Sequence, residues 1–132
     1  MRLLDVWLTV ALAALGGCSK SPDQVAKEAR QAAASWGATL SAAGEWWGAG
    51  EVSTPYFQTV VAQARTSLQK QEQTARKSAG DAAAAPVKAV ASHAAAIAEA
   101  VTRGDRRAAI ESGHAAASEV PAEKTPAVAR PE

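Results

Sequence analysis

Apolar residues recur at steps of three or four positions along residues 25–47. That spacing places one continuous apolar stripe on a single face of a helix of about six turns. Alanine supplies about a quarter of the chain, and no run alternates in the manner of a strand. Because alanine has the highest intrinsic helix propensity, the sequence predicts an all-α fold. The stripe consists of Val25, Ala29, Ala32, Trp36, Leu40, Ala43 and Trp47.

Start and stop signals give the bounds of this first helix. Ser21 is a suitable cap, Pro22 suits the first helical position, and we expect the helix to end near Trp47. Gly37 and Gly44 lie inside it. Both weaken the helix, and both allow a neighbouring helix to approach closely.

A second helix is expected from Thr54, as its cap, and Pro55, at its first position. Its stripe turns polar beyond Leu68, so we expect the following half to project from the core or to fray. Gly80 is the expected end of this helix. The stripe consists of Phe57, Val61, Ala64, Leu68, Gln71 and Ala75.

Two further helices follow, with Asp81 as a cap for the first of them or Pro86 as its true start. Gly104 should end that helix, and Asp105 should cap the last one. A joint this short forces an antiparallel hairpin. Two successive hairpins predict an antiparallel helical bundle of three to four helices. The two stripes are Val87, Val90, Ala94, Ile97 and Val101, then Ile110, Gly113, Ala117 and Val120.

The N-terminus is organised as a secretory signal, with a positive start, an apolar run from Val6 to Leu15 and small residues after it. Its ending, Leu15-Gly16-Gly17-Cys18, resembles the lipobox of bacterial lipoproteins, and the resemblance covers residues 1–18 only. It implies cleavage between Gly17 and Cys18, with a diacylglyceryl group on the Cys18 thiol and a further acyl chain on the new amine.

The resemblance also implies where the protein resides. Two or more acyl chains hold a protein firmly on its membrane. Ser19, rather than an aspartate, follows the cysteine, which favours the outer membrane and a periplasmic location. The alternatives are a plain secretory signal with a chance cysteine, and an uncleaved anchor that is short for a span of about 20 residues. The expected domains are a signal peptide (1–17), a lipidated tether (18–20), an alanine-rich helical domain (21–120) and a disordered proline-rich tail (121–132).

Aromatic residues gather at the junction of the first two helices. Trp46 and Trp47 are adjacent, as are Tyr56 and Phe57, and Trp36 lies about three turns back. Neighbours on a helix are about 100° apart, so Trp47 fits the buried stripe and Trp46 is expected to be exposed. The four adjacent aromatics are either a hydrophobic plug or an interaction surface for a partner, a glycan or the lipid interface.

His93 and His114 are the two histidines, and Glu111 precedes His114 by three residues. Glu-x-x-His is half of a di-iron helix pair. Val90 stands where the second glutamate would be needed, however, and neither histidine falls on an apolar stripe. We therefore expect solvated histidines and no cofactor. The alternative is a bundle in the periplasm that holds a metal, a haem or a small ligand through these three residues.

Charge and motifs favour a protein without enzymatic activity. The formal net charge is +1 with both signs interspersed, so nothing indicates a nucleic-acid partner. No nucleophile elbow and no phosphate loop occur in the sequence. Arg103, Arg106 and Arg107 form a small basic cluster that could contact anionic head groups. The sequence thus favours a structural, accessory or inhibitory lipoprotein whose bundle contacts a protein that the sequence does not identify.

Overall fold

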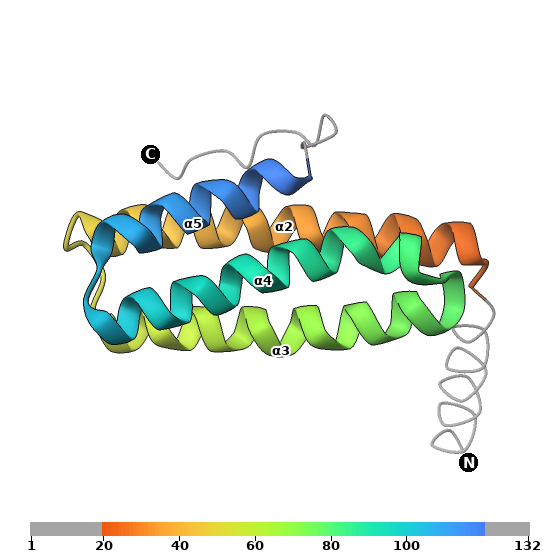
Figure 1. The fold of residues 1–132 in the computed structure, drawn as a ribbon, viewed down its shortest axis with the longest axis horizontal. Helices are drawn as coiled ribbons and strands as arrows, with labels where there is room; N and C mark the ends of the chain where they lie inside the picture. The colour runs from red at the N-terminus through yellow and green to blue at the C-terminus, as the bar shows by residue number, and fades with distance from the viewer. Residues whose placement is uncertain (1–19, 121–132) are drawn as a thin grey trace, which may run out of the picture.

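The computed structural model describes residues 20–120 as four helices, with no strand in this range. They are α2 (Pro22–Gly48), α3 (Thr54–Ala79), α4 (Asp81–Arg103) and α5 (Arg106–Glu119). Consecutive helices run antiparallel (Figure 1). The predicted all-α bundle is confirmed, with four helices rather than three. Cys18, the signal peptide and the tail lie outside the described residues.

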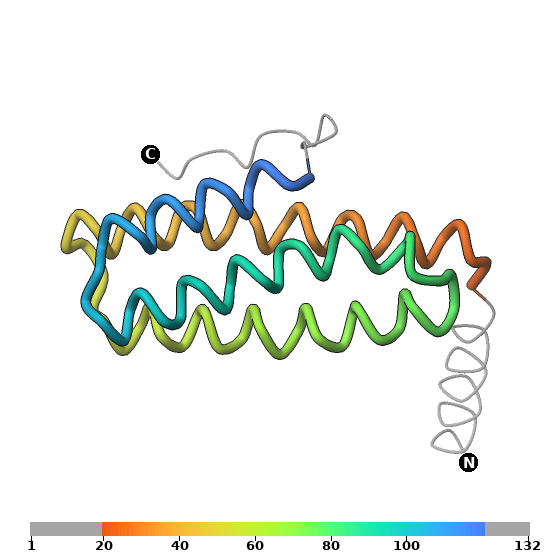
Figure 2. The backbone as a smooth tube through the Cα atoms, viewed as in Figure 1, coloured from red at the N-terminus to blue at the C-terminus, as the bar shows by residue number. Residues whose placement is uncertain are grey.

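Helices α2 and α4 form the centre of the bundle, because each of them contacts the other three helices. Helices α3 and α5 lie on opposite sides, and no pair of their Cα atoms comes within 8 Å. Helix α5 is the shortest and runs beside only the C-terminal part of α2 (Figure 2). The start of α2 therefore shares one end of the bundle with the α3–α4 turn, while the α2–α3 and α4–α5 turns share the other.

Four of the predicted helix ends are confirmed, and one of them is the end of α3 at Gly80. The Ser21 hydroxyl accepts a hydrogen bond from the Gln24 amide at 3.2 Å, and the Asp105 carboxylate accepts one from the Ala108 amide at 3.0 Å. Each satisfies an amide that the first turn of a helix would otherwise leave unpaired. Gly104 ends α4 in the left-handed conformation with φ +69°, which glycine adopts without steric cost.

The prediction of Thr54 as the cap of α3 is wrong by one residue. The cap is Ser53, whose hydroxyl accepts a hydrogen bond from the Tyr56 amide at 3.2 Å. Thr54 is the first helical residue, and its hydroxyl accepts a hydrogen bond from the Trp47 indole at 3.1 Å instead. A tertiary contact thus occupies the Thr54 side chain, and the adjacent serine caps the helix.

The prediction of Asp81 as a cap, or of Pro86 as the start of α4, is also wrong. Helix α4 begins at Asp81 itself, and Gly80, the residue before it, makes no side-chain cap. The Asp81 carboxylate instead pairs with Arg76 at 3.2 Å. Pro86 lies within the helix, where it removes one hydrogen bond to the carbonyl of Ala82. Ala82 is exposed, so water can hydrate that carbonyl.

The buried faces of α3 and α4 follow the predicted stripes, although Gln71 is only half-buried. Helix α3 continues to Ala79, and Ala75 is fully buried. The prediction that the half of α3 beyond Leu68 projects from the core or frays is therefore wrong. The stripe of α2 is wrong in part, because Ala33 and Gly37 are buried where Ala32 and Trp36 were expected. On α5, Ala109 and Ala116 replace Ile110 and Ala117.

These differences arise because α5 packs very closely on α2. A Cβ atom on Gly37 would lie 2.6 Å from the Ala116 carbonyl oxygen. A Cβ atom on Gly113 would lie 3.0 Å from the Leu40 carbonyl oxygen. Each glycine therefore faces the backbone of the other helix, and the buried face of α2 turns towards α5.

We predict opposite effects for two alanine substitutions in α2. Gly37→Ala should lower the free energy of unfolding by about 1–2 kcal/mol, because the clash with the α5 backbone outweighs the gain in helix propensity. Gly44→Ala should instead be neutral or stabilise by up to about 1 kcal/mol, since its Cβ would lie at an ordinary 3.6 Å from Ala109. Urea denaturation followed by circular dichroism measures both. Equal effects of the two substitutions would contradict the close packing.

Candidate interaction surface

A cluster of Trp47, Phe57 and Arg106 joins three helices at the end of the bundle that carries the α2–α3 turn. The Trp47 and Phe57 rings are stacked, with centroids 5.2 Å apart. The Arg106 guanidinium lies 5.0 Å from the centroid of the Trp47 ring, a cation–π distance. Its Nη1 also donates to the Trp47 carbonyl at 2.6 Å. This carbonyl lies in the last turn of α2, where a cation is favourable.

The cluster divides the four adjacent aromatic residues into two pairs. Trp47 and Phe57 are 2% and 0% exposed, so they cannot form part of an interaction surface and instead make the hydrophobic plug. Trp46 and Tyr56 are 47% and 51% exposed. The predicted exposure of Trp46 is therefore observed. Exposed large aromatics are the side chains most enriched at binding hot spots.

Trp46 and Tyr56 lie at the same level of two antiparallel helices. The indole of Trp47 reaches Thr54 near the turn, and the indole of Trp36 reaches the Ser67 hydroxyl at 3.1 Å further along. In the register that these two bonds define, Trp46 lies opposite Tyr56. We call these two residues the aromatic pair.

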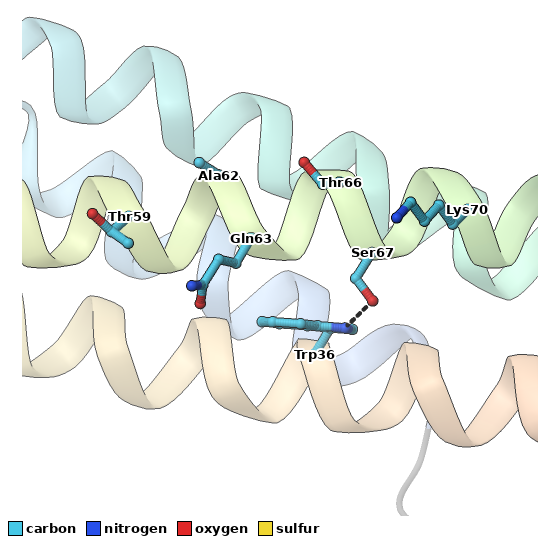
Figure 3. Close-up of a pocket in the computed structure, with 7 residues that line it drawn as sticks. All are labelled: Trp36, Thr59, Ala62, Gln63, Thr66, Ser67 and Lys70. Carbon is cyan, nitrogen blue, oxygen red and sulfur yellow. Dashed lines mark hydrogen bonds between the residues drawn. The ribbon is translucent and has the colours of Figure 1, made fainter.

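A shallow groove of about 610 Å³ lies between α2 and α3. Helix α2 contributes Trp36, whose ring lies across the space between the helices and reaches Ser67 (Figure 3). Gln63 extends from α3 towards the same ring (Figure 3). The lining residues are Trp36, Thr59, Ala62, Gln63, Thr66, Ser67 and Lys70.

The groove presents polar groups beside one aromatic ring. Its lining offers hydroxyl groups, one amide, one ammonium and an indole, and contains no carboxylate, thiol or imidazole. Sequence reasoning missed the groove because it assigned Trp36 to the buried stripe. Trp36 is half-buried at the edge of that stripe. The one available signal was the polar residues of α3 that recur every three or four positions beside the stripe.

The histidines and Glu111 belong to three separate contacts. His93 Nε2 lies 2.8 Å from a Glu119 carboxylate oxygen, and His114 Nε2 lies 2.8 Å from one of Glu45. Glu111 pairs with Arg107 within α5. The two histidine contacts tie α5 to α4 and to α2 respectively.

Within residues 20–120, no three histidine, cysteine, aspartate or glutamate side chains are close enough together to hold a metal ion. In the same range, no helix combines the length and hydropathy that crossing a membrane requires. No protein-family model matches the chain, and neither a curated protein nor a solved structure shows significant similarity to it.

We predict that two neighbouring arginines contribute very differently to stability. Arg106→Ala should lower the free energy of unfolding by about 1–2 kcal/mol, since it removes a charged hydrogen bond and a cation–π contact. Arg107→Ala removes only an exposed pair with Glu111 and should cost less than about 0.5 kcal/mol. Thermal or urea unfolding of the two variants tests this. A loss for Arg107→Ala as large as that for Arg106→Ala would contradict it.

Proposed function

We propose that this protein is a membrane-anchored bacterial envelope lipoprotein without enzymatic activity. Its bundle would serve as a protein-interaction module in a structural, accessory or inhibitory role. Anchoring through acylated Cys18 would hold it on the outer membrane, facing the periplasm. The observation that carries the proposal is the position of the lipobox cysteine, four residues before the first residue of α2.

The position of Cys18 just before α2 supports a molecule that is anchored at one end of the bundle and binds a partner at the other. The lipid would be attached at the end where α2 begins. From Pro22 to Trp46 the helix rises about 36 Å, at 1.5 Å per residue. The aromatic pair and the α2–α3 turn therefore lie at the end of the bundle furthest from the anchor, within reach of a partner away from the lipid.

The exposed chemistry of α2 and α3 supports a protein partner. The aromatic pair supplies two large rings that would lose solvent contact in a complex, and the groove between the same two helices adds hydroxyl groups, an amide and the ammonium of Lys70. Stable interfaces combine an aromatic centre with a polar rim in this way. A helix or an extended segment of the partner fits a shallow groove between two helices.

We predict that Cys18 carries the lipid. Mass spectrometry of the protein purified from membranes should find an N-terminal Cys18 with the mass of a diacylglyceryl group and an added acyl chain. After a high-salt wash, Cys18→Ser should move the protein from the membrane fraction to the soluble fraction, since the apolar chains that hold it are lost. An unmodified N-terminus at another residue, or a Cys18→Ser protein that stays on the membrane through the high-salt wash, would refute the anchor.

We further predict that the aromatic pair contacts the partner. A photo-crosslinking amino acid at Trp46 or at Tyr56 should give a discrete adduct in cells that express the lipidated protein. The same group at Gln73, an exposed position of α3 nearer the anchored end, is the matched control and should give none. Trp46→Ala should weaken the adduct formed from position 56. The same products from all three positions, or no product from 46 and 56, would remove the aromatic pair from the interface.

A further inference from the structure

The lysines of the described residues all lie in one half of the bundle. Lys20 and Lys27 are at the start of α2, Lys70 and Lys77 are in the C-terminal half of α3, and Lys88 is early in α4. These segments share the end of the bundle at which α2 begins (Figure 1), four residues after Cys18 in the sequence. In the rest of residues 20–120, the basic side chains are the arginines Arg65, Arg103, Arg106 and Arg107.

Three of these lysines form what we call the lysine collar: Lys27 on α2, Lys77 on α3 and Lys88 on α4. Each is exposed, and none of the three ammonium groups donates a hydrogen bond to another described residue or forms an ion pair with one. Of the four nearby acids, Glu28, Glu72 and Asp81 are paired with Lys20 or with Arg76, whereas Asp23 is exposed and makes no ion pair with a described residue.

The two ends of the bundle therefore differ in charge. Residues 20–30 and 70–88 carry seven basic side chains against four acidic ones. The remaining described residues carry four basic side chains against six acidic ones. Residues 20–30 and 70–88 therefore carry a net charge of +3 and the remaining described residues a net charge of −2, although the whole chain is almost neutral.

The collar encircles the end of the bundle rather than lining one side. Lys77 lies two residues before the end of α3, Lys27 five residues after the start of α2, and Lys88 seven residues after the start of α4. At 1.5 Å per residue, all three lie within about 11 Å of the end. Because they project from three different helices, no single side of the bundle presents all of them, whereas an end-on contact does.

We propose that the Cys18 end of the bundle stands on an anionic lipid surface, with Lys27, Lys77 and Lys88 bound to phosphate head groups. The proposal rests on the proposed lipid anchor at Cys18. Three residues separate Cys18 from α2, so even at full extension the end of the bundle stays within about 14 Å of the lipidated cysteine. That distance is less than twice the Debye length of about 8 Å at physiological salt.

The positive charge of the collar and its short distance from the proposed anchor both favour an anionic lipid surface as its binding partner. Long lysine side chains extend their ammonium groups towards an interface while their stems stay on the protein. Each lysine near an anionic leaflet strengthens binding about fivefold. With this end bound, the bundle stands upright, and the end with the aromatic pair is held away from the head groups.

Binding to vesicles tests the collar without the anchor. The chain from residue 18 with Cys18→Ser should bind vesicles that contain phosphatidylglycerol, more weakly as salt rises, and should not bind phosphatidylcholine vesicles. Replacing the collar by Lys27→Gln, Lys77→Gln and Lys88→Gln should weaken binding roughly a hundredfold. The matched control, Arg65→Gln, Arg103→Gln and Arg107→Gln, changes the net charge equally and should weaken binding less than about fivefold. Circular dichroism checks that both variants keep their helices.

The outcomes separate the collar from the anchor. Equal losses in the two triple variants, no binding to anionic vesicles, or equal binding to both lipids would each overturn the collar. Mass spectrometry decides the Cys18 modification independently, so the anchor can fail while the collar holds.

The upright orientation of the bundle can be measured separately, in the lipidated protein, by energy transfer. With the Cys18 thiol lipidated, a dye attached at Ser78→Cys or at Glu51→Cys reports its distance from acceptor lipids by energy transfer. Transfer should be strong from position 78, beside the collar, and weak from position 51, in the α2–α3 turn. Equal transfer from both positions would mean that the bundle lies flat, and would overturn the proposal.

Discussion

The close contact between α2 and α5 is the constraint on which the rest of the bundle depends. The core contains many alanines and few large side chains, so it gains dispersion energy only if the helix backbones come close together. Gly37 and Gly113 make this possible, since each leaves room for the backbone of the opposite helix. The glycines lower the intrinsic stability of their own helices, and the packing that they allow offsets that cost.

The packing of the bundle also depends on the cluster around Trp47, which connects the two hairpins at one end. Phe57 of α3 stacks on one part of the ring, and Arg106 of α5 lies over it and binds the end of α2. The first residue of α5 is thus held against the last turn of α2. This cluster also separates the aromatic residues into a buried pair and an exposed pair. Trp47 and Phe57 fill the space between the helices at this end, so the adjacent Trp46 and Tyr56 remain exposed and form the candidate interaction surface.

The proposed anchor and the proposed surface lie at opposite ends of the same helix. Helix α2 begins four residues after Cys18 and carries Trp46 near its end. Its 27 residues act as a spacer of about 40 Å. The distribution of lysines agrees with this division, because every lysine of the described residues lies in the half of the bundle where α2 begins.

The sequence by itself determined the helices and most of their ends, because propensity, capping and apolar spacing act within a few residues. It predicted the all-α bundle, the caps Ser21 and Asp105, the stop at Gly104 and the buried face of α4. Only the tertiary structure decided which way α2 and α5 face each other, since that depends on the room between two backbones rather than on the size of the side chains. Local spacing therefore favoured Trp36 and Ile110 for the core, where packing buries Gly37 and Ala109. The Trp47 indole likewise binds the Thr54 hydroxyl, and the capping of α3 moves to Ser53. The groove beside Trp36 and the lysine collar arise from residues of different helices, and only the fold brings them together.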